Sequence, residues 1–301
     1  MRTVYLGTSE FAAAVLRRLS DSPHRPVLVV TRPDRPRGRG RKLASPPVAD
    51  AARELGIALE QPASVNDDAT LRVIEAAAPE AVCVCAFGAL ITEPLLSRFE
   101  MLNVHPSLLP RWRGAAPVER AIMAGDEQTG VSIMRLTAGL DSGPVCAQVT
   151  EPIRSEDTYG TLAARLEVLG ADLLVRTLDT EPPCVEQDEA GVIYAAKIEP
   201  PDRELDPSRS AAELERVVRA LTPHIGAYVV LEDGTRLGVS AARVLGDGGP
   251  PTPSTPSAGV VSLAGPRPVL GCAEGALELL VVQPPGRRPM PAEDYLRGRR
   301  S

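Results

Sequence analysis

Short apolar runs alternate with amphipathic stretches through the first 180 residues of the chain. Continuous apolar runs predict buried strands, and apolar positions repeated every three or four residues predict helices. The predicted strands lie at 4–6, 27–30, 57–59, 81–86, 101–105, 131–136 and 145–153, and the helices at 11–19, 48–55, 71–77, 117–123 and 162–178. Alternating buried strands and helices are typical of an α/β fold. The pattern therefore predicts a Rossmann-like, mostly parallel sheet with helices on both faces.

The pattern changes after the helix predicted at 162–178. The segment 180–207 is rich in Pro, Asp and Glu and lacks helical periodicity, which is typical of a linker, with one short strand near Ile193. One helix at 211–220 follows, and then short strand-like runs separated by turn residues, at 227–231, 236–245, 260–263, 268–272 and 276–282. Such runs predict a small β-barrel. We therefore expect an α/β domain at 1–179, a linker at 180–207 and a barrel domain at 208–301.

Polar side chains stand at the end of the strand predicted at 101–105. Asn103 and His105 alternate with apolar residues there, and Pro106 ends the strand. In open α/β sheets, ligands bind at the carboxyl ends of the strands. Further along the chain, a loop punctuated by glycines presents Asp141 between two predicted strands. The amide, the imidazole and the carboxylate make a candidate catalytic triad.

Charge is unevenly distributed along the chain. The net charge of -6 by itself argues against nucleic acid as a partner, since binding to phosphates is driven by basic surface. From Arg32 to Lys42, however, basic residues are separated by Pro and Gly and are opposed by the single acidic residue Asp34. This composition predicts a mobile, solvated basic loop.

Cysteine usage and hydropathy limit the class of protein. Five cysteines are an odd number without a CxxC pair, which argues against a disulfide framework and a tetrahedral zinc site, so we expect free thiols. Cys83 and Cys85 alternate along a predicted buried strand and are expected to be small apolar core residues. No run of about 18 apolar residues predicts a membrane span, and the N-terminus is typical of a first strand rather than a signal peptide. The sequence thus predicts a cytoplasmic protein.

Several ordered motifs resemble one enzyme family. An Asn-x-His at 103–105 followed by a downstream Asp is the signature of formyltransferases that use 10-formyltetrahydrofolate, and the run SLLPRWRGAAP at 107–117 narrows the match. Two upstream motifs, GTSEFA at 7–12 and GRGRKL at 38–43, fit the same family. Several ordered motifs with compatible spacing rarely occur together by chance. The chain resembles, from its first strand to its C-terminal tail, the family members that formylate methionine on initiator tRNA.

The resemblance implies acyl transfer to an amine. A formyl group would move from N10 of the folate to the α-amino group of methionine esterified to initiator tRNA, through a tetrahedral intermediate with a negatively charged oxygen. Asn103 would donate a hydrogen bond to that oxygen, His105 would relay the proton of the attacking amine, and Asp141 would orient His105. No metal is required for this reaction.

The resemblance also implies binding residues. The formyl donor, 10-formyltetrahydrofolate, would be bound by Phe87, Gly88, Leu90, Ser107, Leu108, Leu109, Pro110, Thr137 and Gly139. The acceptor arm of the tRNA would be bound by Arg37, Arg39, Arg41 and Lys42. Relatives often have Tyr where this chain has Phe87, so a hydroxyl contact is absent there. The second domain would be an OB-like barrel, and the protein would act as a monomer away from membranes.

Other classes of protein share parts of this pattern. A formyltransferase that acts on an amino sugar linked to a nucleotide would share the triad and the folate site but would not need the basic loop. A glycinamide ribonucleotide formyltransferase is expected to be one shorter domain. A Rossmann-type oxidoreductase needs GxGxxG after its first strand, and the run that begins at Gly7 lacks the second glycine. A non-catalytic RNA-binding protein would leave the candidate triad without a role.

Overall fold

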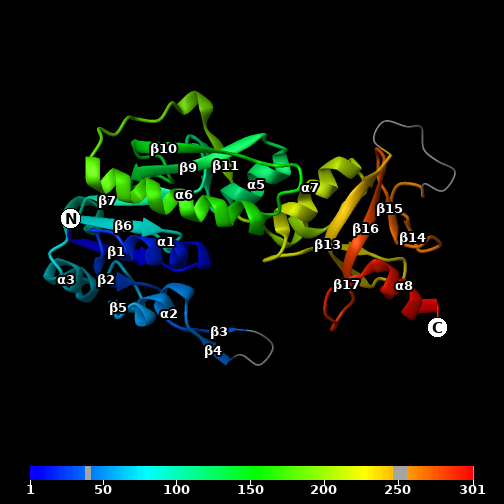
Figure 1. The fold of residues 1–301 in the computed structure, drawn as a ribbon, viewed down its shortest axis with the longest axis horizontal. Coiled ribbons are helices and arrows are strands. Elements are labelled where there is room, and N and C mark those ends of the chain that lie inside the picture. Colours follow the sequence, from blue (N-terminus) through cyan, green and yellow to red (C-terminus); the bar gives the residue numbers. More distant parts are fainter. Residues whose placement is uncertain (38–41, 247–255, 301) are drawn as a thin grey trace. The chain divides into compact units, whose positions relative to one another are not determined.

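The computed structural model describes residues 1–37, 42–246 and 256–300, and the chain forms two compact units (Figure 1). Unit 1 consists of Met1–Gly114, Gln128–Pro152 and Ala163–Ala195. Unit 2 consists of Ala115–Glu127, Ile153–Leu162 and Ala196–Ser301. Each unit therefore combines segments that are distant in the sequence. The linear domain boundaries expected at residues 179 and 208 stay a prediction.

A seven-stranded sheet forms the centre of unit 1, with the strand order β10-β9-β7-β6-β1-β2-β5. The strands from β5 to β7 in this order run parallel, and β9 and β10 are antiparallel to their neighbours at one edge. The expected mostly parallel sheet is thus confirmed. The strands are β1 (Thr3–Gly7), β2 (Pro26–Val30), β5 (Ala58–Glu60), β6 (Ala81–Cys85), β7 (Met101–His105), β9 (Gln128–Arg135) and β10 (Val145–Pro152).

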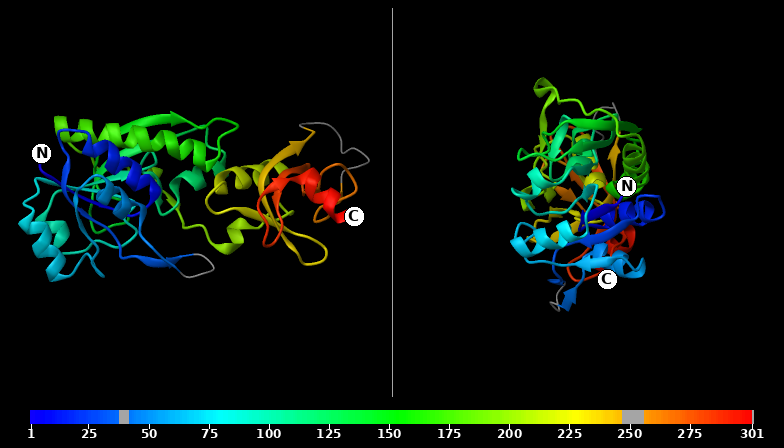
Figure 2. Two further views of the ribbon diagram at one scale, coloured as in Figure 1. Left: turned by 60° about the horizontal axis from the view of Figure 1, so that its bottom comes forward. Right: turned by 90° about the vertical axis from the view of Figure 1, so that its left-hand side faces the viewer.

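Helices cover both faces of this sheet (Figures 1 and 2). Successive residues of a strand point to opposite faces, so β1 contacts both helical layers. Leu6 belongs to a buried apolar cluster that includes Ile74 of α3. On the other face, the Tyr5 hydroxyl donates a hydrogen bond to the carbonyl of Ala12 in α1 (2.6 Å). The helices are α1 (Glu10–Ser20), α2 (Pro47–Glu54), α3 (Asp68–Ala76), α4 (Leu95–Arg98) and α6 (Tyr159–Thr180).

Two short strand pairs lie outside the central sheet of unit 1. β3 (Arg35–Arg37) and β4 (Lys42–Ala44) are antiparallel, with Arg37 opposite Lys42. The two ends of the predicted basic loop are thus paired strands, and its mobility stays a prediction. β8 (Arg111–Gly114) pairs in parallel with β11 (Ile193–Ala195), which confirms the short strand expected in this region. The 3-10 helix η1 (Glu189–Gly191) precedes β11.

An antiparallel sheet packs against helix α7 in unit 2. Its strand order is β12-β13-β16-β15-β14, and β17 also pairs with β16. Ser210 and Glu213 form a capping box at the start of α7, and Leu214 and Leu221 share a buried core with Leu237 of β13. This curled sheet is the small barrel-like domain expected from the sequence. The elements are α5 (Pro117–Ala124), η2 (Pro200–Arg203), α7 (Ala211–Leu221), β12 (Ala227–Val230), β13 (Arg236–Leu245), β14 (Val261–Ser262), β15 (Val269–Gly271), β16 (Ala276–Gln283), β17 (Met290–Pro291) and α8 (Ala292–Arg300).

Helix α5 belongs to unit 2 although it precedes β9 in the sequence. It packs against α7. Glu119 of α5 lies 2.9 Å from Nε2 of His224, and Arg120 donates two hydrogen bonds to the carboxylate of Asp202 (3.1 and 2.9 Å). Unit 2 is therefore held together by contacts between residues about 80 to 105 positions apart in the sequence. Among the described residues, no helix is long and apolar enough to span a bilayer.

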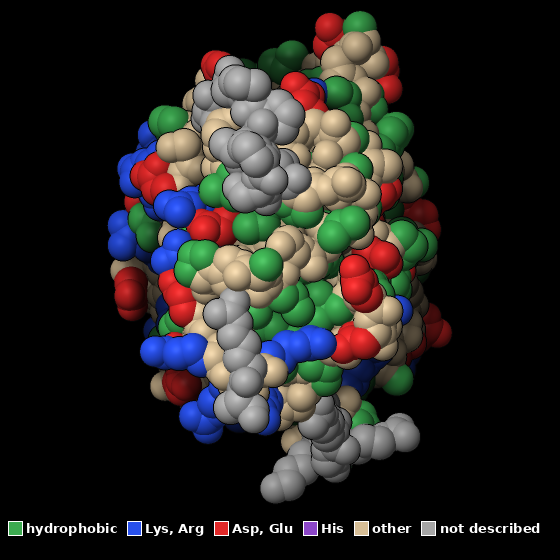
Figure 3. All heavy atoms as spheres, turned by 90° about the vertical axis from the view of Figure 1, so that its right-hand side faces the viewer, with side chains coloured by type: hydrophobic (Ala, Val, Ile, Leu, Met, Phe, Trp, Pro, Cys, Tyr) green, Lys and Arg blue, Asp and Glu red, His purple; other side chains and the backbone are tan. Residues whose placement is uncertain are grey.

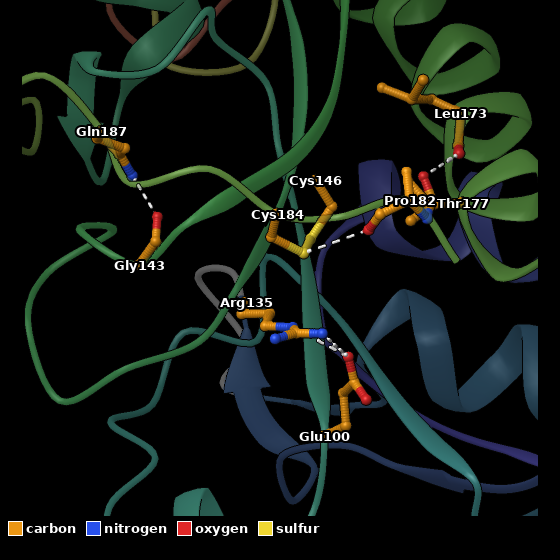
Figure 4. The surroundings of a disulfide bond; sticks show 9 residues. All are labelled: Glu100, Arg135, Gly143, Cys146, Leu173, Thr177, Pro182, Cys184 and Gln187. Atoms are coloured by element: carbon orange, nitrogen blue, oxygen red, sulfur yellow. Dashed lines mark hydrogen bonds and ion pairs between the residues drawn. A yellow bond between two sulfur atoms is a disulfide. The ribbon is translucent and has the colours of Figure 1, made fainter. Parts of the chain in front are cut away.

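Cys146 of β10 and Cys184, which follows α6, form a disulfide (Figure 4). The expectation of free thiols was therefore wrong for this pair. Val145 and Val185 form an antiparallel bridge, so the residues beside them face each other across the two segments. The separation of 38 positions in the sequence gives no sign of this proximity.

Titration of thiols checks the disulfide. Cys83, Cys85 and Cys272 are free and buried, and desolvation raises the pKa of Cys83 and Cys85 to about 12 and that of Cys272 to about 11. The thiolate is the reactive form, so native protein at about pH 8 should react very slowly with a thiol reagent. After denaturation without reductant, three thiols should titrate, and after reduction all five. Five reactive thiols without reduction would contradict the disulfide.

Candidate active site

Asn103 and His105 lie on one face of β7, at its carboxyl end. The intervening Val104 points to the opposite face, where a Cβ on Gly170 of α6 would lie only 3.0 Å from a Val104 methyl group. Met101, on the same face as the polar pair, belongs to the buried apolar cluster of unit 1. Asn103 is 8% exposed and His105 is 4% exposed. The strand therefore presents an amide and an imidazole from an apolar core toward its carboxyl end.

The two ring nitrogens of His105 face different groups. Nε2 lies 2.9 Å from the carbonyl oxygen of Trp112, and Nδ1 lies 3.6 Å from Oδ2 of Asp141. A carbonyl oxygen can only accept a hydrogen bond, so Nε2 must carry a proton. In the neutral ring, Nδ1 is then the basic nitrogen, and it is directed toward the carboxylate. The structure thus brings His105 and Asp141 together, as the sequence predicted.

Strand β8 positions both members of this pair. Trp112 and Gly114 have positive φ values of 66° and 125°, and this bent strand directs the Trp112 carbonyl to His105. The Gly114 N–H donates to Oδ2 of Asp141 (2.9 Å). A Cβ on Gly114 would lie 2.7 Å from the carbonyl oxygen of Ala195, so only glycine fits here. The sequence gives no sign of these contacts, because they are made by backbone atoms that any residue carries.

The side-chain amide of Asn103 is available to a ligand. The residue is mostly buried, and no hydrogen bond joins its side-chain amide to another described residue. The amide is not one of the fully enclosed polar atoms without a partner, so solvent reaches it, and a substrate atom can take the place of that solvent. The site therefore offers a hydrogen-bond donor, a base and a carboxylate at one end of β7.

The loop after β6 contains three of the predicted folate-binding residues. Phe87 is 5% exposed and belongs to the apolar cluster, whereas Leu90 is 74% exposed, and Gly88 has a φ of 70°. Part of this loop lines a pocket of about 350 Å³, formed by Arg32, Pro33, Arg35, Pro62, Ala63, Ser64, Val65, Asn66, Phe87, Ala89 and Leu90. Phe87 thus anchors the loop in the apolar core, and Leu90 is an exposed apolar side chain that a ligand could cover.

The predicted folate-binding segment after β7 is firmly tied to the sheet. The Ser107 hydroxyl donates to the carbonyl of Arg111, and Ser132 of β9 donates to the carbonyl of Ser107 and accepts from the N–H of Leu109. Gln148 donates to the carbonyl of Leu109. Leu108 and Pro110 flank this residue. Several backbone groups of the segment are therefore already engaged in hydrogen bonds. The segment can form a rigid wall of a binding site, but these groups are not free to bind a ligand.

The remaining predicted site residues lie in two loops. The Asp141 loop, defined as residues 136–144 between β9 and β10, contains Thr137 and Gly139, and the Thr137 hydroxyl lies 3.4 Å from that of Ser142. The predicted tRNA contacts Arg37 and Lys42 face each other in the backbone register of the β3–β4 hairpin, and Arg39 and Arg41 lie outside the described residues.

Comparison with known proteins fits this arrangement. Residues 1–178 match the family of formyl transferases, and residues 197–300 match the C-terminal domain of formyl transferases. The fold and the site thus define a formyltransferase. Methionyl-tRNA formyltransferase of Methylococcus capsulatus is 43% identical over 98% of this chain and 96% of its own length. That of Halorhodospira halophila is 43% identical over 99% of this chain and 96% of its own length. The chain belongs to the methionyl-tRNA formyltransferase family.

Solved structures share the fold at low sequence identity. HypX of Aquifex aeolicus in complex with tetrahydrofolic acid superimposes with a TM-score of 0.64 at 17% identity, covering 98% of this chain and 47% of HypX. An N-formyltransferase of Helicobacter canadensis, in complex with folinic acid and dTDP-3-aminofucose, superimposes with a TM-score of 0.66 at 13% identity, covering 93% of this chain and 98% of that protein. These likenesses concern the fold.

Proposed function

We propose that this protein transfers the formyl group of 10-formyltetrahydrofolate to the α-amino group of methionine on initiator methionyl-tRNA. Membership in the methionyl-tRNA formyltransferase family over nearly the whole chain supports this substrate. The observation that carries the chemistry is the end of β7, where Asn103 lies on the same face as His105 and the Asp141 carboxylate lies 3.6 Å from Nδ1 of that ring.

Asn103 stabilises the developing negative charge in this proposal. When the amine attacks the formyl carbon, the formyl oxygen gains charge and becomes a much stronger hydrogen-bond acceptor. A preorganised donor in a site that excludes water lowers the barrier by about 3 kcal/mol. Asn103 suits this role because its side chain is mostly buried and its amide makes no hydrogen bond with another described residue, so the donor is available to the formyl oxygen.

His105 moves the proton in this proposal. The bond from Nε2 to the Trp112 carbonyl leaves Nδ1 as the nitrogen that can accept a proton from the attacking amine. Asp141 lies beside Nδ1 and stabilises the imidazolium that results. His105 then returns the proton to N10 of the folate as the carbon–nitrogen bond breaks. The protein thus supplies a donor, a base and a counter-charge, and needs no nucleophilic side chain.

We assign the binding surfaces to loops of unit 1. The folate is assigned to the loop after β6, to residues 107–110 and to the Asp141 loop. The acceptor arm of the tRNA is assigned to the β3–β4 hairpin. On the face shown in Figure 3, Lys and Arg side chains gather along one margin with Asp and Glu side chains among them. The positive charge proposed to attract the tRNA is that of the sequence from Arg32 to Lys42, against a net charge of -6 for the whole chain. We place the reaction in the cytoplasm, with the protein acting as a monomer.

The function is tested with alternative formyl acceptors. Purified protein, 10-formyltetrahydrofolate and charged initiator methionyl-tRNA should yield formylmethionyl-tRNA. A nucleotide-linked amino sugar and charged elongator methionyl-tRNA should be formylated much more slowly. Faster transfer to the amino sugar would replace the proposed acceptor, and no transfer to any amine would refute the assignment.

Substitutions of the basic residues between Arg37 and Lys42 are expected to differ in their effects on tRNA binding and formylation. Arg37→Ala or Lys42→Ala should weaken tRNA binding modestly and reduce its salt dependence by about one phosphate contact. Arg39→Ala should lower formylation of tRNA strongly and leave folate affinity unchanged, an expectation that rests on the sequence motif. The comparison uses initiator tRNA and a tRNA with an altered first acceptor base pair. If Arg39→Ala and Arg37→Ala lower activity on both tRNAs by the same factor, Arg39 contributes charge alone.

A further inference from the structure

We propose that Gln187 is a positioning residue that holds the Asp141 loop in its active conformation. The inference rests on the catalytic role proposed above for Asp141. Gln187 lies between Cys184 and η1, and its side chain reaches the main chain of the loop rather than the Asp141 carboxylate.

The side-chain amide of Gln187 donates two hydrogen bonds to the Asp141 loop. Nε2 lies 2.8 Å from the carbonyl oxygen of Asp141 and 2.7 Å from that of Gly143, and the second bond is drawn in Figure 4. Asp141 itself has a φ of 45°, a left-handed conformation that few residues other than glycine, asparagine and aspartate adopt. Two bonds to carbonyls on either side of Ser142 hold the chain in this turn.

The other end of the amide fixes its orientation. Oε1 of Gln187 accepts from Nε of Arg113 (3.0 Å), and Arg113, which is 2% exposed, donates to the carboxylate of Glu189 (2.8 Å). A guanidinium has no acceptor, so the oxygen of Gln187 must face it and the NH₂ group must face the carbonyls. Gly114, the neighbour of Arg113 in β8, binds the Asp141 carboxylate. One short strand thus holds the side chain of Asp141 directly and its main chain through Gln187.

The segment that carries Gln187 is anchored to the sheet. Val145 and Val185 exchange two backbone hydrogen bonds of 2.8 Å, and the adjacent disulfide joins Cys146 to Cys184. Gln187 therefore extends from a fixed point only two residues away. A loop held from such a point keeps the Asp141 carboxylate near Nδ1 of His105, and small errors in the placement of catalytic groups reduce rates strongly.

Gln187→Glu is the sharpest test. The substitution keeps the shape of the side chain and the oxygen that accepts from Arg113, but it removes both donated bonds and places a carboxylate against two carbonyl oxygens. In the full chain with its disulfide intact, kcat should fall about 10- to 100-fold, with KM for folate and for methionyl-tRNA changed less than about threefold. Glu186→Gln, a change at an exposed neighbour, should keep full activity.

A double-mutant cycle separates positioning from general damage. If Gln187 acts through Asp141, the combination of Gln187→Glu with Asp141→Asn should be no slower than Asp141→Asn alone, because the second change removes what the first one misplaces. Multiplication of the two losses would overturn the proposal. So would full activity of Gln187→Glu beside a strongly impaired Asp141→Asn, which would leave the proposed function intact. Full activity of Asp141→Asn would instead remove the role of Asp141, and the inference with it.

Melting curves and a second substitution at Gln187 control for loss of folding. Each variant is melted, and activity is compared at a temperature at which all are folded. If Gln187→Glu does not fold, Gln187→Met, which removes the hydrogen bonds without adding charge, takes its place in the same cycle. The proposal predicts the same loss of kcat and the same absence of an additional loss beside Asp141→Asn. Full activity of Gln187→Met would overturn it.

Discussion

Replacing His105 by alanine is expected to lower kcat by about 100-fold or more, the usual scale for loss of a general acid or base. Nε2 of the imidazole bonds to the Trp112 carbonyl and Nδ1 lies 3.6 Å from Asp141, so the substitution removes the proposed proton acceptor. Single-turnover formylation of methionyl-tRNA measures this loss without interference from product release. Folate binding should change little, because the assigned folate contacts lie on other residues.

His105→Gln is the matched control for this experiment. A glutamine amide can still donate a hydrogen bond to the Trp112 carbonyl, but it cannot accept a proton at neutral pH. We therefore expect His105→Gln to be as slow as His105→Ala while folding more like the natural chain. Recovery of activity in the glutamine variant would mean that His105 contributes only the hydrogen bond to β8.

Replacing Asn103 by leucine is expected to separate stability from activity. Loss of one oxyanion donor should lower kcat by about 100- to 1,000-fold. Because the Asn103 amide makes no hydrogen bond with another described residue, an apolar side chain of similar size should change the melting temperature little.

Asn103→Asp serves as the companion variant. It preserves the shape of the side chain, removes the donor and adds a negative charge where charge develops, so its loss should be at least as large. A large drop in melting temperature in Asn103→Leu, with a small drop in kcat, would show that the amide is structural. Differential scanning calorimetry and the formylation assay together decide between the two roles.

Local patterns predicted much of unit 1 and the centre of the site. β7 could be predicted because apolar residues alternate with Asn103 and His105 and because Pro106 ends the strand. The loop with Asp141 could be predicted from its glycines. Once a mostly parallel sheet is predicted, the carboxyl end of β7 is the expected place for a ligand, because ligands of such sheets bind at the carboxyl ends of the strands. The 3.6 Å approach of Asp141 to His105 follows that expectation.

The supporting residues could not be predicted from local patterns. β8 consists of Arg, Trp, Arg and Gly and pairs with β11, which begins about 80 residues later, so no apolar period marks it. Gln187 and the disulfide depend on the same long-range return of the chain toward β10. Helix α8 was missed because, among its described side chains, only Ala292 and Leu296 are buried, which is too few residues to show a helical repeat among charged neighbours.

The position of helix α5 in the sequence has a consequence for folding during synthesis on the ribosome. It emerges early, at residues 117–124, yet its partner α7 is not made until residues 211–221. At about 5 to 20 residues per second, the helix waits several seconds before Arg120 can meet Asp202 or Glu119 can meet His224. During that interval the ion pairs that α5 makes in the folded chain cannot form, so unit 2 can complete its fold only after η2 and α7 have been synthesised.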